Sequence, residues 1–297
     1  MRFWQSVAFL ETAQLLEVAR ASDAAGYHGI TMSDHVVYPE KLSSLYPYSG
    51  DGSPPFDAAT EWPDAWVTIA AMAAVTEHLR FTTNIFVAPA RNPFLLAKAV
   101  ATAATLSHGR VALGLSAGWM REEFDLLGQP FASRGKRLDE MIDVLRLLWS
   151  GGMVEHHGHH YDFDRVEMSP LPPAPVLIYA GGHSEAALAR AANLDGWIGN
   201  AYLPEDAARI LADLQRHRAA AGTLDRDDYE IVLGLIAWPD AKLCERFSAL
   251  GVTGLLCAPW MTGPPSAAAA KLPLRDVLAS IDRFAEAVVH PLAEVGG

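Results

Sequence analysis

The residues best suited to chemistry on a small molecule lie around a pair of glycines. Gly181 and Gly182 follow the continuous apolar run 176–180 and precede a helical pattern. A strand, a glycine turn and a helix start in this order bring backbone N–H groups close to a phosphate, and the helix start adds a partial positive charge. His183 and Ser184 add side-chain donors at the same point. The segment indicates a phosphate site, and the alternative is a tight turn that binds nothing.

A histidine that could carry a proton follows another apolar run. Asp34 and His35 come directly after residues 29–32, at the predicted end of a strand. Histidine is the side chain most easily arranged to hold or transfer a proton near neutral pH. We interpret His35 as the candidate catalytic residue and Asp34 as a candidate ligand contact, whereas the alternative is a surface or turn histidine.

Two further polar stretches occupy similar positions. Asn84 and Ile85 end or interrupt the run 79–87, where an asparagine could turn its amide towards a ligand ring or simply end the strand. The small residues that follow the run 110–115 would let a flat ligand approach the backbone, and the tryptophan after them would line a pocket or plug it; these residues are Ser116, Ala117, Gly118 and Trp119.

Two charged or titratable clusters favour simpler interpretations. Four histidines could form a metal-binding tract, but they lie in a polar segment with no matching carboxylates or cysteines: His156, His157, His159 and His160. Metal-dependent barrel hydrolases usually carry His-x-His on the first strand, and the run 3–9 has none. We therefore predict no metal.

The basic residues at 134–137 are interpreted as a solvated helix start, with docking of an acidic group as the alternative.

The elements that must position these residues alternate along the chain. Predicted strands lie at 2–9, 29–32, 79–87, 110–115, 176–180, 196–199, 229–237 and 252–257, and helical patterns follow nearly all of them. This alternation over a single domain, 1–297, predicts an α/β (β/α)₈ barrel with insertion segments, and a doubly wound sheet is the alternative. In a barrel, ligands bind at the carboxyl ends of the strands, where the polar stretches fall.

The composition indicates which partners are excluded and in which compartment the protein is expected. Of 297 residues, 51% are apolar and the formal net charge is −12, which argues against nucleic acid and anionic membranes as partners. Cys244 and Cys257 have no metal-like spacing, which indicates a reducing compartment. We see no signal peptide and no apolar run of about 18 residues, so we expect a cytoplasmic protein.

Taken in order, a set of individually weak motifs between about Gly26 and Asn200 resembles the luciferase-like monooxygenase superfamily, the bacterial-luciferase-type flavin and deazaflavin barrels. The motifs are Ser33-Asp34-His35, 79–83 leading to 89–93, 97–102, 106–114, Gly118-Trp119 with Glu123-Phe124 and Gly128, 134–140, and Gly181-Gly182 with Asp195-Gly196-Trp197. Within the superfamily the pattern is most similar to the branch that uses coenzyme F420, a deazaflavin.

This resemblance implies a (β/α)₈ barrel in which the cofactor lies across the strand ends. Its phosphate would lie near Gly181, Gly182 and Ser184. By position, a non-prolyl cis peptide bond at Asn84-Ile85 would back the ring. The family places cofactor contacts and a catalytic histidine at the positions of Asp34 and His35. Members that oxidise a sugar phosphate carry a glutamate where this chain has Trp119, so we do not expect that reaction.

The resemblance implies an F420-dependent oxidoreductase that transfers a hydride between the deazaflavin and a small organic substrate, with His35 handling the proton. One alternative is an FMN-dependent monooxygenase that receives reduced flavin from a separate reductase. Another is a non-catalytic cofactor-binding barrel. We expect a homodimer. Aromatic residues of the irregular segment 38–62 suggest a hydrophobic pocket, a lid or a dimer contact: Tyr38, Tyr46, Tyr48, Phe56 and Trp62.

Overall fold

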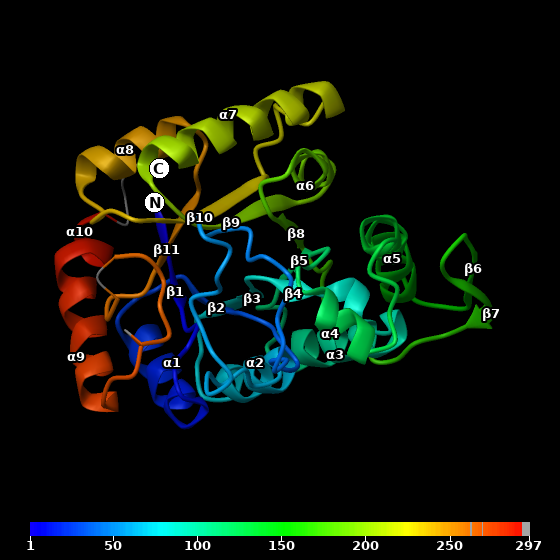
Figure 1. Ribbon diagram of the computed structural model, residues 1–297, viewed down its shortest axis with the longest axis horizontal. Helices are drawn as coiled ribbons and strands as arrows, with labels where there is room; N and C mark the ends of the chain where they lie inside the picture. The colour runs from blue at the N-terminus through cyan, green and yellow to red at the C-terminus, as the bar shows by residue number, and fades with distance from the viewer. Residues whose placement is uncertain (262, 269, 293–297) are drawn as a thin grey trace.

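A ring of parallel strands surrounded by helices forms the body of the protein (Figure 1), seen in a computed structural model that describes residues 1–261, 263–268 and 270–292. The main sheet has nine strands in the order β3-β2-β1-β11-β10-β9-β8-β5-β4. Their bounds are β1 Arg2–Ser6, β2 Gly29–Met32, β3 Arg80–Thr83, β4 Phe86–Val87, β5 Leu113–Ser116, β8 Ile178–Gly181, β9 Gly196–Tyr202, β10 Glu230–Leu235 and β11 Gly254–Cys257.

The sheet closes on itself near Phe81. The Phe81 N–H donates to the carbonyl of Arg110 at 2.8 Å, and Phe81 forms a parallel bridge with Val111, just before β5. Strands β3 and β4 are two parts of one strand position, so the nine strands occupy eight positions around the ring. The predicted (β/α)₈ barrel is confirmed, and the doubly wound alternative is wrong.

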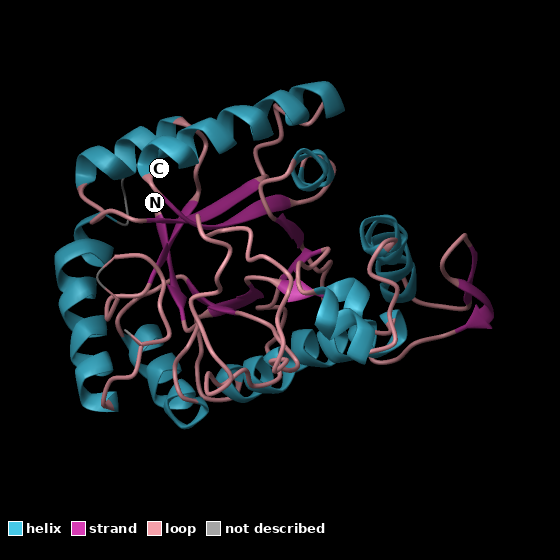
Figure 2. Ribbon diagram, viewed as in Figure 1, coloured by secondary structure: helices cyan, strands magenta, loops and turns pink. Residues whose placement is uncertain are grey.

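Helices cover the outside of the ring (Figure 2). The strand pairs of the main sheet are parallel. The helices between strands are α1 Leu15–Ala24 after the 3-10 turn η1 Thr12–Gln14, α2 Ala65–Ala73, α3 Pro93–Leu106 after η2 Ala88–Ala90, α5 Arg134–Trp149, α6 Glu185–Ala191, α7 Pro204–Ala221, α8 Ala241–Ala249 and α9 Leu274–Phe284, which continues as η3 Ala285–Val289 and α10 His290–Leu292. Side-chain oxygens of Asp64 and Asn92 cap α2 and α3 by accepting from backbone N–H groups one turn on. No helix of the described residues is both long and apolar enough to cross a bilayer.

Packed side chains fill the interior of the amino-terminal part of the barrel. The Trp4 indole is 2% exposed and lies inside the ring with Tyr179 and Ile198. A Cβ on Gly29 would lie 2.5 Å from the Trp4 ring, so β2 needs a glycine at this position. The barrel is therefore a filled core below its open mouth.

Two insertions lie outside the regular alternation. Residues 151–168 include the antiparallel hairpin of β6 (Val154–His157) and β7 (Asp162–Val166), which projects beyond α5 at the right of Figure 1. The short helix α4, Arg121–Leu126, was not predicted, because six residues are too few to show a helical period. The first strand ends at Ser6, before Phe9, whose φ of 70° does not fit a strand.

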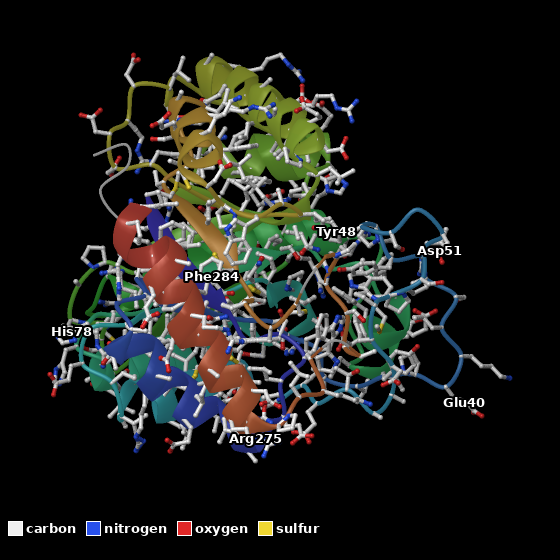
Figure 3. All side chains as sticks on the ribbon, turned by 90° about the vertical axis from the view of Figure 1, so that its left-hand side faces the viewer. Glu40, Tyr48, Asp51, His78, Arg275 and Phe284 are labelled. Carbon is white, nitrogen blue, oxygen red and sulfur yellow. The ribbon has the colours of Figure 1, made fainter. Side chains whose placement is uncertain are left out.

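The long irregular segment between β2 and α2 lies over the carboxyl ends of the strands. Figure 3 shows Glu40, Tyr48 and Asp51 of this segment on one side of the molecule and His78, which precedes β3, on the opposite side. We call residues 36–62 the mouth loop.

Candidate functional site

A cavity of about 1070 Å³ opens at the carboxyl ends of the barrel strands. Every residue predicted to belong to the site lines it: Asp34, His35, Asn84, Ile85, Ser116, Ala117, Gly118, Trp119, Gly181, Gly182, His183 and Ser184. Strand direction explains this convergence, because parallel strands deliver the residues that follow them to the same end of the barrel.

His35 is held by a buried carboxylate. Its Nδ1 lies 3.3 Å from Oε2 of Glu123 in α4, and the other oxygen of Glu123 accepts from the Val36 N–H. The Glu123 side chain is 1% exposed. Burial alone would raise the pKa of Glu123, but the bonds and charge from His35 and the bond from Val36 together hold that pKa below its ordinary value. Glu123 is therefore ionised at neutral pH, and an ionised carboxylate can only accept, so Nδ1 of His35 carries a proton.

That arrangement leaves the other imidazole nitrogen available. Nε2 of His35 has no hydrogen-bond partner among the described residues, and His35 lines the cavity. A side chain fixed through Nδ1 and free at Nε2 can accept a proton from a bound molecule or donate one to it.

Asp34 is used mainly within the protein. Its carboxylate pairs with Arg91 Nη2 at 2.6 Å and accepts from the Val87 N–H at 3.0 Å. Burial raises the pKa of Asp34, while the Arg91 guanidinium and the Val87 N–H act in the opposite direction. The Arg91 guanidinium also lies over the Phe86 ring. Asp34 thus links the end of β2 to β4 beside His35. It lines the cavity, but its carboxylate is already engaged by Arg91 and the Val87 N–H.

The break between β3 and β4 forms part of the cavity wall. The Asn84-Ile85 peptide bond is cis and non-prolyl, as the resemblance implied. The Ser33 hydroxyl donates to the Asn84 carbonyl at 2.9 Å, and the Asn84 amide donates across the mouth to the Gly199 carbonyl at 3.3 Å. The Ile85 side chain lies so close to Gly181 that a Cβ there would be 2.3 Å away. An apolar side chain and a bare backbone therefore meet at this wall.

The Ser116–Trp119 turn forms the neighbouring wall. Gly118 has φ of 82°, and a Cβ on it would lie 2.5 Å from Val87, so only glycine suits this turn. Trp119 lines the cavity, with its ring centroid 5.9 Å from that of His35 and 5.3 Å from that of Tyr46. The tryptophan is a wall of an open cavity and does not plug it.

Aromatic rings of the mouth loop extend over the cavity from His35 to the glycine turn. At one end, the Phe56 and Trp62 rings each lie 5.0 Å from the His35 ring. At the other end, the Tyr48 ring lies 5.0 Å from the His183 ring. Tyr46, between them, accepts from the Asn200 amide at 3.2 Å. The pocket interpretation of this segment is supported for Tyr46, Tyr48, Phe56 and Trp62, which line the cavity, whereas Tyr38 packs against Phe56 and does not line it.

Four hydrogen bonds from the mouth loop to α4 hold the loop in place. The Glu122 carboxylate accepts from both the backbone N–H and the hydroxyl of Ser43 and Ser44. Burial acts to raise the pKa of Glu122, but these bonds outweigh it and lower the pKa to about 2. The adjacent residue Glu123 holds His35, so one short helix positions both the loop and the candidate catalytic side chain.

Cationic side chains gather near the glycine turn. Arg134 and Lys136 of α5 and Arg190 of α6 line the same cavity as Gly181 and Gly182. Arg190 pairs with Asp139, and Arg134 donates to the Gly118 carbonyl, whereas Lys136 has no ion-pair partner among the described residues. The basic stretch at 134–137, interpreted as a solvated helix start, thus contributes to the cavity, which favours its alternative, an acidic ligand.

The glycine turn itself has the backbone form that its sequence predicted. Gly182 has φ of 98°, a conformation that residues with a side chain rarely adopt. The Ser184 oxygen caps α6 by accepting from the Ala187 N–H. Burial lowers the pKa of His183, which lies 3.4 Å from the Tyr202 hydroxyl. His183 is therefore a neutral donor or acceptor at pH 7.

The histidine cluster lies away from the cavity, on the β6–β7 hairpin. His156 contacts Glu140, and His157 contacts Asp162. Within the described ranges, no group of three or more His, Cys, Asp or Glu side chains is arranged to hold a metal ion.

The sequence did not predict which residues support the site residues. Glu123 stood within a recognised motif, but its pairing with His35 joins positions 88 apart in the sequence. Phe56 and Trp62 were predicted to form a hydrophobic pocket, a lid or a dimer contact, but nothing in the sequence placed them beside His35. The Lys136 and Arg190 cations reach the cavity from two different helices. The signal for Lys136 was the clustering of charge at 134–137, which by itself is also typical of a solvated helix start, and Arg190 lies outside that cluster.

Comparisons with known proteins identify the family of the chain. The model of the family described as luciferase-like monooxygenase matches residues 6–242. An uncharacterized protein of Mycobacterium tuberculosis (strain ATCC 25618 / H37Rv) is 35% identical over 292 residues, which is 97% of this chain and 99% of that protein. The F420-dependent hydroxymycolic acid dehydrogenase of the same organism is 31% identical over 217 residues, 71% of this chain and 55% of the dehydrogenase.

Solved structures share the fold at lower identity. Monooxygenase RslO1 from Streptomyces bottropensis superposes with a TM-score of 0.76 at 16% identity, covering 98% of this chain and 99% of its own. The oxygenating constituent of 3,6-diketocamphane monooxygenase from Pseudomonas putida, in complex with FMN, superposes with a TM-score of 0.63 at 17% identity, covering 83% of this chain and 70% of its own. The matched family model, together with a barrel whose mouth carries the expected residues, shows that this chain belongs to the luciferase-like monooxygenase family, whose oxidoreductases include F420-dependent and FMN-dependent members.

Proposed function

We propose that the protein is an F420-dependent oxidoreductase that moves a hydride between the deazaflavin and a small organic substrate. The observation that carries the proposal is the pairing of His35 with the ionised Glu123 on the wall of the same cavity as the glycine turn and its cations. A proton carrier and an anion-binding end in one cavity are what hydride transfer with a phosphate-bearing cofactor requires.

The chemistry of the donor set fits such a cofactor. Lys136, Arg134 and Arg190 supply positive charge beside Gly182 and Ser184, where a phosphate could be bound. Ile85 and Ile198 supply apolar surface on the barrel side for a flat ring. The volume of about 1070 Å³ exceeds that of most pockets for a single drug-sized ligand, so cofactor and substrate both have room.

Each group of this chain then has a distinct role. When bound, a deazaflavin supplies or accepts a hydride at its ring carbon. His35 takes the proton of a substrate hydroxyl at Nε2 in the oxidising direction, or returns it in the reducing direction. Glu123 keeps the imidazole ring in one orientation and stabilises the charge that forms on it. The mouth-loop rings exclude water from the reacting atoms.

Support for a deazaflavin over FMN comes from the relative that is 31% identical over 71% of this chain and is named as F420-dependent. FMN also carries a phosphate and a flat ring, so the same cavity would accommodate it. The two cofactors must therefore be separated by experiment.

The decisive experiment titrates the purified protein with oxidised F420 and, separately, with FMN, following cofactor and tryptophan fluorescence. We expect F420 to bind at micromolar concentration or below and FMN to bind at least tenfold more weakly. The reverse order would assign an FMN-dependent monooxygenase. If neither cofactor bound at micromolar concentration, the glycine turn would be only a turn and the proposal would be wrong.

Two lysine variants test where the phosphate lies. Lys136→Ala should weaken binding of the preferred cofactor, because Lys136 is the cavity cation without a partner in the described part of the chain. Lys242→Ala is the matched control, since Lys242 lies exposed in α8, outside the cavity lining. If Lys136→Ala and the parent protein bound the cofactor equally well, the cofactor phosphate would not lie at this end of the cavity.

A further inference from the structure

We infer that the part of the cavity around His35 takes a neutral, largely apolar, ring-containing alcohol or carbonyl compound. This inference rests on the proposed function, because it assigns the substrate of the same site. It is carried by the side chains that surround His35, by the absence of available charge among them, and by the position of the cavity cations.

Aromatic rings surround the imidazole on several sides. Phe56 and Trp62 each lie 5.0 Å from it, centroid to centroid, and Trp119 lies at 5.9 Å. Phe9, which follows β1, lies 5.6 Å from Trp62, and all of these rings line the cavity. We call these four side chains, Phe9, Phe56, Trp62 and Trp119, the aromatic chamber. Aromatic walls bind an apolar or ring-shaped ligand most favourably, because both apolar surfaces leave water and the rings can pack edge to face or offset.

Charges near the chamber are already engaged. Glu123 is bonded to His35 and to the Val36 N–H, and Asp34 is paired with Arg91. A carboxylate or phosphate among the rings would lose its hydration without gaining a free cation. Among the described residues, the uncharged polar groups left without a partner here include Nε2 of His35 and the buried indole N–H of Trp62, and both suit a neutral hydroxyl or carbonyl oxygen.

The cations of the cavity come from a different wall. Arg134 and Lys136 belong to α5 and Arg190 to α6, whereas the chamber is built from the mouth loop and the residues after β1 and β5. The cavity is thus divided into a cationic end, suited to the phosphate of a cofactor, and an aromatic end, suited to an uncharged substrate.

The test compares three probes that differ in charge and polarity: 1-tetralone, a neutral bicyclic ketone; 1-naphthoate, which has two similar rings and a carboxylate; and glucose 6-phosphate. Isothermal titration of the cofactor-free protein, repeated with saturating F420 or FMN, gives each Kd. We expect 1-tetralone to bind at least tenfold more tightly than 1-naphthoate in both states, and glucose 6-phosphate not to bind the chamber.

Chamber variants locate the binding. Phe56→Ala and Trp62→Ala should weaken 1-tetralone binding about tenfold or more. The milder Phe56→Leu keeps the test valid if either alanine variant fails to fold, as judged by circular dichroism. Phe94→Ala is the matched control, because Phe94 is 36% exposed, packs on Phe163 of the hairpin and lies outside the cavity lining. It should leave every Kd unchanged.

Three results would overturn the inference. The first is binding of 1-naphthoate or glucose 6-phosphate as tight as that of 1-tetralone, and the second is unchanged 1-tetralone binding in the chamber variants. The third is loss of 1-tetralone binding at saturating cofactor, which would mean that the cofactor ring itself occupies the chamber. Failure of the proposed function is separate. If neither cofactor binds, but the parent protein binds 1-tetralone selectively and Phe56→Leu does not, then the cofactor assignment is wrong and the apolar binding site is supported.

Discussion

Glu123 should determine which nitrogen of His35 carries the proton, and this can be measured without knowing the substrate. Hydrogen bonds to charged groups contribute about 1.5–3 kcal/mol. The Nδ1–Oε2 distance of 3.3 Å exceeds the usual ~2.7–2.9 Å of a charge-assisted bond, so the lower end of that range applies. About 1.5 kcal/mol corresponds to roughly a tenfold preference for the Nδ1–H form. In Glu123→Gln the amide can donate as well as accept, so the preference should largely disappear.

The assay is a long-range ¹H–¹⁵N spectrum of histidine-labelled protein, in which the two ring nitrogens of each tautomer have distinct shifts. His35→Ala assigns the signal. Asp125→Asn is the matched control, because Asp125 is an exposed acid of the same short helix, α4, and its side chain has no partner in the described structure. We expect Nδ1 of His35 to be protonated in the parent protein and in Asp125→Asn. A signal from the Nε2–H form in the parent protein would refute the positioning role of Glu123.

Three further variants test the site and its support. His35→Ala should lower turnover about 100-fold or more while leaving cofactor affinity unchanged, since its role is proton transfer; steady-state kinetics beside a cofactor titration separate the two, and unchanged turnover would end the catalytic role. Asp34→Ala should lower the free energy of unfolding by about 3 kcal/mol, the low end for a broken buried pair, because Arg91 is left 19% exposed and unpaired; urea unfolding measures this, and a change below about 1 kcal/mol would contradict it. Glu122 has a folded-state pKa near 2 against an ordinary value of 4.5, so its loop bonds should stabilise the protein fully above pH 4.5 and progressively less as pH falls towards 2. The stability difference between the parent protein and Glu122→Gln, measured by urea unfolding at pH 7 and pH 3, should therefore shrink at the lower pH, and a constant difference would argue against the loop bonds.

The sequence by itself determined the barrel and the approximate positions of its strands. Few folds can bury eight apolar strands together with the apolar faces of the helices between them. Each apolar run overlaps a strand of the structure. The predicted residues were found on one cavity because they follow those strands directly, and strand direction alone brings them together. The glycine turn at Gly181-Gly182 was predicted from the sequence, and the φ of 98° at Gly182 agrees with it.

Only the tertiary structure decided how those residues are held and what surrounds them. The pairs His35–Glu123 and Asp34–Arg91 join positions 88 and 57 residues apart, and no local pattern encodes such a distance. The mouth loop has no periodicity, so its rings could belong to a pocket, a lid or a dimer contact until packing placed them beside His35. Lys136 and Arg190 lie on separate helices and converge only because the barrel closes. Propensity and spacing act within a few residues, whereas the charge and shape of the site come from contacts between distant segments.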